Sequence, residues 1–466
     1  MSEVVGKLWG FCNTLRHDGI GYGDYIEQLT YLLFLKLAQE KAVKLPQGCT
    51  WADLKAKSGT ELLDAYTEIL RTLSRQKGML GDIFAGSLSK FREPVNLKKL
   101  IGLIDETQWT AIDVDIKAEA YEGLLQKYAE EEKGAGQYFT PREAIRCVVR
   151  CMKPDIRQKL NFTIHDPAVG TAGFLIGAYE WMLKQTKEGG LLTREERERL
   201  QTRTFSGCEL VLDTRRLALM NLYLHEIEAE IYFGDSLAEG SHTSKRYDVV
   251  MTNPPFGTKG AGQAPIREDF TVKTANKQLN FVQHVMTILK PGGRAAMVVP
   301  DNVLFEETAG KEVRKLLMED CNLYTILRLP IGTFTPYSPG VKANIIFFTK
   351  GEPTKEVWIY DNRTNVEKVT IRHTLTADYF KDFEACYHAK PRKETERFGR
   401  FTREEIAKRD HNLDILWMRD ESIEDEEQVA EPEELVEEAL TEVQTAMDAL
   451  NDIALILSNG KRLDRT

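Results

Sequence analysis

Residues 247–256 read Tyr-Asp-Val-Val-Met-Thr-Asn-Pro-Pro-Phe, an apolar run that stops abruptly at two prolines. The run before Asn253 is typical of a short strand, and Pro254 and Pro255 end it because proline has no amide hydrogen to continue a ladder. The rigid corner presents the Asn253 side chain and the Asn253 and Pro254 carbonyls beside the ring of Phe256. Acceptors next to a stacking face suit a planar amino group on a heterocycle. A strand that simply ends in a proline loop is the alternative.

Strand-like and helix-like segments alternate from about residue 160 onward. Strands are expected at residues 162–165, 204–208, 231–233, 247–252, 294–299, 324–329 and, as the last of the series, 344–348. Residues 286–289 are expected to close a helix, and residues 291–293 to form a turn. This alternation predicts an α/β fold with a doubly wound, largely parallel sheet.

A polar residue comes directly after each of the first four expected strands: Asp166, Glu209, Asp235 and Asn253. Ligands of doubly wound sheets bind at the carboxyl ends of the strands, near the switch in strand order. All four residues are therefore expected along one rim. A chance arrangement gives no reason for four hydrogen-bonding side chains at the same end of four successive strands.

The loop that follows the first strand, residues 166–173, contains two glycines but is not Gly-x-Gly-x-x-Gly and has no phosphate-binding lysine. A dinucleotide or a nucleoside triphosphate is therefore disfavoured. Glu209 suits ribose hydroxyls, Asp235 suits an adenine amino group, and Asp166 with the glycines suits an α-amino acid end. Together these groups describe S-adenosylmethionine, with its methyl group directed toward Asn253.

Residues 1 to about 130 read as helical, because apolar residues recur there at helical spacing. A polar and then glycine-rich stretch, residues 130–136, marks a hinge or loop after them. Thr140 with Glu143 predicts a capping box, with Pro141 at the first helical position. Tyr138 and Phe139 would then lie at the start of this helix, either as simple packing or as ligand contacts.

The composition bounds the class of protein. A chain of 466 residues is too long for one ordinary domain, and its net charge of −10 argues against gripping a polyanion alone over a large surface. No apolar run is long enough to span a bilayer and no signal peptide is recognised, so we expect a cytoplasmic protein without membrane contact. Seven cysteines without a Cys-x-x-Cys pair and scattered histidines predict no metal site, and Cys147 and Cys151, four apart on an expected helix, are read as core residues.

The carboxyl-terminal part is densely acidic from Glu421 to Glu438, which is typical of a solvated segment. Apolar residues then recur alternately four and three apart at Val436, Leu440, Val443, Met447, Leu450, Ala454 and Leu457. This spacing predicts a coiled-coil seam of about three heptads. The seam could pair within the chain or with a helix of a partner.

Three motifs resemble those of amino-group DNA methyltransferases: residues 166–175 resemble the cofactor motif, 253–256 the catalytic motif and 136–141 an upstream cofactor contact. Their order matches the N6-adenine branch. Further matches resemble the modification (methylase, M) subunit of type I restriction–modification systems, so that the resemblance covers nearly the whole chain. These matches are residues 8–37, 329–334 with 340–344, 358–361 and 410–414.

The resemblance implies a Rossmann-like, S-adenosylmethionine-dependent methyltransferase domain at residues 133–418. An α-helical domain at residues 1–132 precedes it, and an acidic segment with a coiled-coil helix for subunit docking follows at 419–466. It also implies methylation of adenine N6 in double-stranded DNA, with the target adenine flipped out. The implied partners are a specificity (S) subunit and a restriction (R) subunit, with two methylase subunits per specificity subunit.

The resemblance also assigns residues. The catalytic set is Asn253, Pro254, Pro255 and Phe256. The cofactor-binding set is Gln137, Tyr138, Phe139, Thr140, Asp166, Ala168, Gly170, Thr171, Gly173, Glu209, Asp235 and Ser236. Val169 and Ala172 depart from the family pattern, which favours a small residue and a glycine there, and we expect altered loop geometry or weaker cofactor affinity.

Other readings stay open. Residues 257–262 could be a surface loop or a mobile lid over the target strand, with Lys259 on a phosphate. A protein glutamine N5-methyltransferase could use the same Asn-Pro-Pro-aromatic corner. A non-catalytic scaffold could retain a degenerate methyltransferase domain.

Overall fold

The computed structural model describes residues 6, 9–12, 15, 19–109, 121, 123–125, 127, 139–189, 192–240, 244–256, 265, 267–335, 340–370 and 372–419. The chain divides into two compact units, residues 1–416 and 417–466, and the elements below all belong to the first. Several predictions lie outside the described residues: the hinge at 130–136, Gln137, Tyr138, the loop at 257–262, the acidic segment and the coiled-coil seam.

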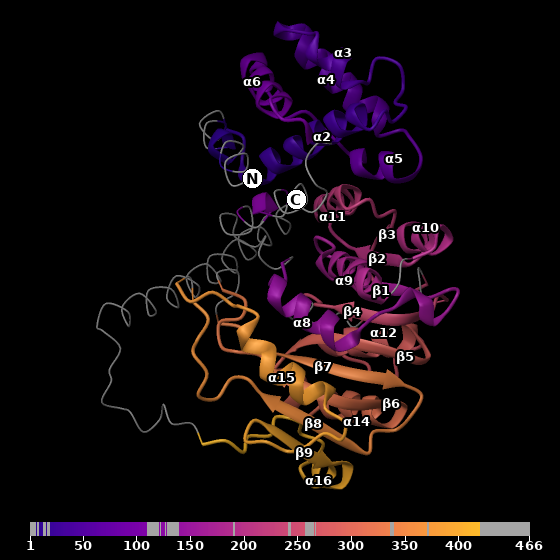
Figure 1. Cartoon of the computed structure of the whole chain (residues 1–466), viewed down its shortest axis with the longest axis vertical. Coiled ribbons are helices and arrows are strands. Elements are labelled where there is room, and N and C mark those ends of the chain that lie inside the picture. Colours follow the sequence, from indigo (N-terminus) through magenta and orange to yellow (C-terminus); the bar gives the residue numbers. More distant parts are fainter. Residues whose placement is uncertain are drawn as a thin grey trace, which may run out of the picture. The chain divides into compact units, whose positions relative to one another are not determined.

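The amino-terminal part is helical as predicted, within the residues that the structure describes (Figure 1). Its helices are α2 (Tyr22–Glu40), α3 (Trp51–Lys55), α4 (Gly59–Leu73), α5 (Gly78–Phe84) and α6 (Pro94–Asp105). Helix α2 is the centre of this helical domain, because apolar side chains all around it are buried. The ring of Trp9 stacks on that of Tyr22, with centroids 5.4 Å apart, and joins the start of the chain to α2.

The remaining part contains a nine-stranded sheet with the order β3-β2-β1-β4-β5-β7-β6-β8-β9. The strands are β1 (Ile164–Asp166), β2 (Phe205–Glu209), β3 (Glu230–Phe233), β4 (Tyr247–Thr252), β5 (Leu289–Pro300), β6 (Cys321–Arg328), β7 (Ala343–Lys350), β8 (Glu356–Asp361) and β9 (Phe398–Thr402). Pairings from β3 through β5 are all parallel, which confirms the predicted direction for the half that carries the candidate site.

The other half of the sheet differs from the prediction. Strand β7 runs antiparallel to both β5 and β6, and two further strands, β8 and β9, follow the segment that was expected to be the last. The two-residue side-chain period of a strand is the same in either direction, so the sequence pattern could not reveal the reversal. The predicted turn at 291–293 was also wrong, because these residues belong to β5 at a point where its register with β4 shifts.

Helices connect and cover the strands (Figure 1). They are α8 (Arg142–Met152), the 3-10 helix η3 (Ile156–Gln158), α9 (Gly173–Gly189), α10 (Arg194–Thr202), α11 (Leu212–Leu224), α12 (Lys277–Ile288), α13 (Asn302–Phe305), α14 (Ala309–Asp320), α15 (Asp378–His388) and α16 (Arg403–Lys408). Helix α8 packs on α9 and α15, and α12 packs on α14. Cys147 and Cys151 of α8 are buried, as expected of core residues.

The predicted capping box at Thr140 is wrong. Helix α8 begins at Arg142, Pro141 is its N-cap, and no side chain caps it. The Thr140 hydroxyl instead accepts a hydrogen bond from the Asn253 amide, while Glu143 forms an ion pair with Arg146. Thr140 therefore hydrogen-bonds to Asn253, far away in the sequence, and not to the start of its own helix.

The strand order switches between β1 and β4, because β1 pairs in parallel with β2 on one side and with β4 on the other. The carboxyl ends of these strands therefore lie along one edge of the sheet. Asp166 and Glu209 are the last residues of β1 and β2, Asp235 lies just beyond β3, and Asn253 directly follows β4. The predicted rim is confirmed. None of the helices among the described residues is long and apolar enough to cross a membrane.

Candidate active site

The loop between β1 and α9, residues 166–173, ties the ends of two strands together. The buried carboxylate of Asp166 accepts a hydrogen bond from the amide of Ala168, with Oδ1 and N 3.0 Å apart. The amide of Gly170 donates to Glu209 Oε2 at 3.0 Å, and the amide of Val211 donates to Glu209 Oε1 at 2.9 Å. Glu209 therefore fixes both the loop and the start of the segment after β2.

The loop contains an alanine in a conformation that favours glycine. Ala172 has φ +70° and is fully buried, and Gly170 has φ +53°. The Cβ of an L-residue costs roughly 1 to 2 kcal/mol in the left-handed region, so the surroundings impose this shape. Val169 is accommodated differently, because a Cβ on Gly207 of β2 would lie only 2.9 Å from Val169 Cγ2. The two departures from the family pattern thus leave the loop closed against β2.

The segment after β3 also reaches the loop. The Ser236 hydroxyl donates to the Pro167 carbonyl at 2.5 Å, and Asp235 Oδ1 accepts from the amide of Leu237 at 2.9 Å. The ends of β1, β2 and β3 are therefore joined by side chains and backbone of the predicted site.

Two exposed apolar side chains at this rim were missed in the sequence analysis. Leu210 is 59% exposed and Phe233 is 58% exposed. Leu210 directly follows Glu209, and Phe233 is the register partner of Glu209 on the neighbouring strand. Large apolar groups left in water beside an acid suit the faces of a planar ring. Their adjacency to the predicted acid was the available signal.

Asn253 is held in one orientation at the end of β4. Its Nδ2 donates to Thr140 Oγ1 at 3.0 Å, from the segment before α8. Its Oδ1 is buried and has no hydrogen-bond partner among the residues that the structure describes. Because buried acceptors are normally satisfied, this oxygen is poised for a donor from a ligand.

The ring of Phe256 is half-buried and packs edge-on against Phe334, with centroids 6.1 Å apart and an interplanar angle of 87°. Phe334 lies in the loop after β6, which turns at Gly332 with φ +77°. A Cβ at Gly332 would lie 2.1 Å from the Val369 carbonyl oxygen, so only glycine fits. Phe334 belongs to the motif at residues 329–334, but the sequence did not predict its contact with Phe256.

Side chains of two other family-like motifs, residues 358–361 and 410–414, lie at the base of the loop after β6. Asp361, at the end of β8, accepts from the amide of Arg363 at 2.8 Å. The Arg363 guanidinium bonds to Asp301 at 2.7 Å and to the Leu329 carbonyl at 3.2 Å. Asp414 forms an ion pair with Arg328 at 3.1 Å. These side chains therefore hold the loop that carries Phe334.

The rim carboxyls titrate unusually. Burial raises the pKa of Asp166 to about 7, and burial likewise raises the pKa of Glu209, against backbone hydrogen bonds that lower it. A buried carboxyl that pays for its charge with lost hydration gains most from a cationic or hydrogen-bond-donating ligand. Perturbed carboxyls in a polar rim mark a candidate functional site.

The described members of the predicted set lie around this rim. Ala168, Gly170 and Thr171 are in the loop, and Gly173 opens α9. Phe139 is half-buried and packs against the core, while Thr140 contacts Asn253. Among the described residues no group of three histidine, cysteine or acidic side chains converges in a way that could hold a metal ion.

Comparisons with known proteins identify relatives over the full length. A family model described as N-6 DNA methylase matches residues 112–427. The methylase subunit of the type I restriction enzyme StySPI from Salmonella potsdam is 38% identical over 520 aligned residues, covering 99% of this chain and 97% of that protein.

Solved structures of type I restriction–modification proteins are also similar to this chain. The M protein of the type I restriction enzyme EcoKI is 35% identical, with a TM-score of 0.56 and coverage of 96% of this chain and 95% of that chain. A chain solved in work on complex assembly and conformational transition of a type I restriction–modification system is 29% identical. Its TM-score is 0.74, over 98% of both chains.

Asp166→Asn should change how stability depends on pH. The folded state holds a proton that the unfolded chain releases, since the pKa of Asp166 is raised from an ordinary value of about 4. Wild-type stability should therefore fall relative to the variant as pH rises from about 4 to about 7, by up to about 1.4 kcal/mol per pH unit. Urea unfolding across this range measures the difference, and a constant difference would contradict the raised pKa.

Proposed function

We propose a mechanism for this chain on the premise that it belongs to the N-6 DNA methylase family and, within it, to the methylase subunits of type I restriction enzymes. It is therefore an adenine-specific DNA methyltransferase of a type I restriction–modification system. The observation that carries the mechanism is the buried Oδ1 of Asn253, three residues before Phe256, which has no hydrogen-bond partner in the described part of the chain.

The proposed methyl donor is S-adenosylmethionine, which supplies, when bound, a methyl group on positively charged sulfur. The rim fits its chemical groups. Asp166, whose carboxyl gains from a cation, would hold the amino acid end together with the loop glycines. Glu209 keeps lone pairs for ribose hydroxyls, and Asp235 would accept from the adenine amino group. The exposed side chains of Leu210 and Phe233 would cover the faces of that ring.

The remaining predicted cofactor contacts complete this proposal. Ala168, Thr171, Gly173 and Ser236 belong to the loop and to the segment bonded to it. Gln137, Tyr138 and Phe139 would contact the donor from the segment before α8. For Thr140 the hydrogen bond with Asn253 favours a positioning role in addition to, or in place of, a cofactor contact.

Catalysis would rest on hydrogen bonding and stacking by the corner itself. Adenine N6 is a poor nucleophile, because its lone pair is delocalised into the ring. Asn253 Oδ1 and the Pro254 carbonyl oxygen would accept hydrogen bonds from the two N–H groups of adenine N6. These bonds would localise the lone pair on N6, while Pro255 keeps the corner rigid. Phe256 would stack on the flipped base, which is worth roughly 1 to 3 kcal/mol. Positioning and electrostatics supply such catalysis.

The two rival functions lose ground for different reasons. A protein glutamine methyltransferase would need only the corner and the rim, whereas the similarity to type I methylase subunits extends over 99% of this chain. A degenerate scaffold has no use for an Asn253 whose amide is oriented and whose acceptor is left open.

The partners would supply what the acidic chain lacks. Relatives are named as subunits of restriction enzymes, and one solved relative concerns complex assembly of a type I system. We propose double-stranded DNA as substrate, a specificity subunit that provides most of the grip, a restriction subunit, and two methylase subunits per specificity subunit. Residues 1–132 would form a helical domain, 133–418 the catalytic domain and 419–466 the docking extension.

Asn253→Ala should abolish methyl transfer while S-adenosylmethionine still binds, because only the N6 acceptor is lost. Tritiated methyl incorporation, with the specificity partner present, measures this on DNA and on protein in parallel. Wild-type labelling of DNA by the variant would overturn the assignment of Asn253. Labelling of protein in place of DNA by the wild type would favour the glutamine methyltransferase.

Thr140→Val should lower kcat by up to about tenfold with little change in KM for S-adenosylmethionine, since one hydrogen bond that orients Asn253 is worth about 0.5 to 1.5 kcal/mol. Thr140→Ser keeps the hydroxyl and should stay near wild type. If the valine variant instead raises this KM and leaves kcat unchanged, Thr140 is a cofactor contact, as the sequence predicted.

Deletion of residues 430–466 should release the specificity subunit without affecting S-adenosylmethionine binding, because the proposed seam lies within them. Co-purification of the two subunits measures complex formation, and titration calorimetry measures the affinity for S-adenosylmethionine. A deleted chain that still forms the complex would refute the docking role.

A further inference from the structure

Helix α11 contacts the helical domain with one part of its surface and the cofactor loop with another. It begins three residues after Glu209, at Leu212, and ends at Leu224. Ten of its residues are buried, including polar side chains that the proposed mechanism does not use. Arg216 and Asn221 are among them.

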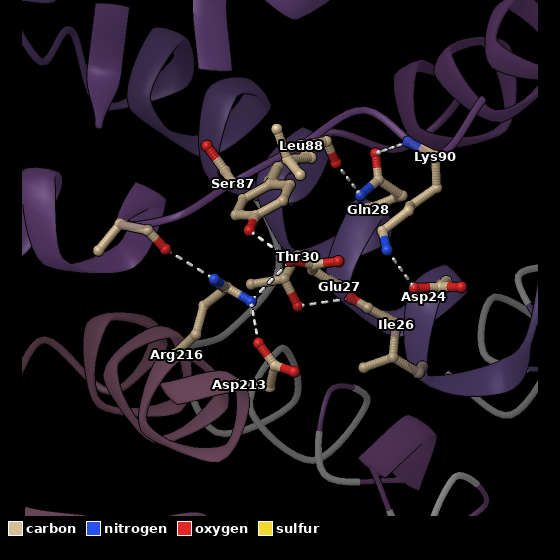
Figure 2. A network of polar contacts seen from close by, with 12 residues as sticks. Asp24, Ile26, Glu27, Gln28, Thr30, Ser87, Leu88, Lys90, Asp213 and Arg216 are labelled. Carbon is tan, nitrogen blue, oxygen red and sulfur yellow. Dashed lines mark hydrogen bonds and ion pairs between the residues drawn. The ribbon is translucent and has the colours of Figure 1, made fainter. Parts of the chain in front are cut away.

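The Arg216 guanidinium is buried between α11 and the helical domain (Figure 2). Its Nη1 lies 2.7 Å from a carboxylate oxygen of Glu27 and 2.9 Å from one of Asp213. Its Nε donates to the Ile83 carbonyl at 3.0 Å, and its Nη2 donates to the Ala85 carbonyl at 2.8 Å. The planar, always charged guanidinium therefore joins α11 to α2 and to the end of α5 at one point.

The same turns of α2 hold the segment between α5 and α6 (Figure 2). Gln28 Nε2 donates to the Leu88 carbonyl at 3.0 Å, and Lys90 forms an ion pair with Asp24 at 3.0 Å. Burial raises the pKa of Glu27, against the attraction of Arg216, which lowers it. Arg216 thus favours the charged form of Glu27, and α2, the α5–α6 segment and α11 are held together.

Contacts on either side of Arg216 extend this interface along α11. Arg215 forms an ion pair with Asp82 at 2.8 Å. The rings of Phe34 and Tyr223 have centroids 4.9 Å apart, so α2 meets α11 near its carboxyl end as well. The helical domain therefore contacts α11 both in its first half and near its carboxyl end.

Asn221 connects α11 to the cofactor loop. It is 1% exposed, and its Nδ2 donates to the Thr171 carbonyl at 3.0 Å. Thr171 lies next to Ala172, whose left-handed conformation must be imposed by its surroundings. A hydrogen bond from a rigid helix to the neighbouring carbonyl is one such constraint.

We infer that α11 couples the helical domain to the cofactor loop, with Arg216 and Asn221 as positioning residues for S-adenosylmethionine. This inference rests on the proposed function, since it takes residues 166–173 as the cofactor loop. A change at the interface with the helical domain alters the loop although it touches no ligand. The helical domain is then part of the cofactor-binding machinery as well as a packing unit.

The test measures cofactor affinity and loop protection in the full-length chain. Arg216→Lys keeps a charge for Glu27 but cannot reach both carbonyls, and Asn221→Leu removes the bond to Thr171. Each variant should raise the Kd for S-adenosylmethionine in calorimetry by at least about fivefold, the lower end of typical coupling between sites. Combining them should cost less than the product of the two effects, because both act through one helix.

Arg314→Met is the matched control. Arg314 on α14 is as buried as Arg216 and bonds to the carbonyls of His411 and Val303. Arg314 lies on a helix that packs on β6 and α12, and its hydrogen bonds to His411 and Val303 reach neither the cofactor loop nor the helical domain. The variant should therefore lower the melting temperature but leave the Kd within twofold. If Arg216→Lys and Asn221→Leu behave like this control, the coupling is absent and the contacts serve stability alone.

A second control separates this inference from the proposed function. Glu209→Gln changes a proposed cofactor contact, and an unchanged Kd in this variant would contradict the proposed site itself. Hydrogen exchange at the amides of Gly170 and Ala172, measured without cofactor, tests the coupling between α11 and the loop even in that case. Exchange should be faster in Arg216→Lys and Asn221→Leu than in wild type and Arg314→Met; equal rates would overturn the inference.

Discussion

The parallel pairing of β1 with β2 on one side and β4 on the other is the constraint on which the site depends. It brings the ends of strands far apart in the sequence to one edge. The hydrogen bond from the Gly170 amide to Glu209 then closes the loop of β1 onto the end of β2. The corner at Asn253 follows β4 on the opposite side of β1. The groups proposed to bind the methyl donor and the base therefore lie at a common edge because of the strand order.

The sequence predicted this arrangement because its signals are local. Each rim residue stands at the end of an apolar run, and helices between such runs favour parallel strands. Pro254 and Pro255 marked the end of β4 without ambiguity. The direction of β7 carried no such signal, and neither did the two short strands after it. Helical periodicity likewise identified α2 but gave no hint that Glu27 pairs with Arg216.

Leu210 was missed although it directly follows Glu209, but the other errors and omissions at the site involve contacts between segments far apart in the sequence. Thr140 and Glu143 fit a capping box, yet the hydroxyl of Thr140 bonds to Asn253, more than a hundred residues away in sequence. The edge contact of Phe334 with Phe256 and the tolerance of Val169 by Gly207 are also tertiary. Local patterns determine which residues can act, and packing between distant segments determines how they are oriented.

Ala172 has a consequence for the timing of the reaction cycle. Its left-handed backbone costs roughly 1 kcal/mol more than glycine would there, so we expect local opening of the loop to be about fivefold more frequent than with glycine. A loop that opens more often exchanges its occupant faster, and departure of the spent donor is frequently the slow step of an enzyme. A single methyl group in an unfavourable conformation can therefore shorten the residence time of the product and hasten the next turnover.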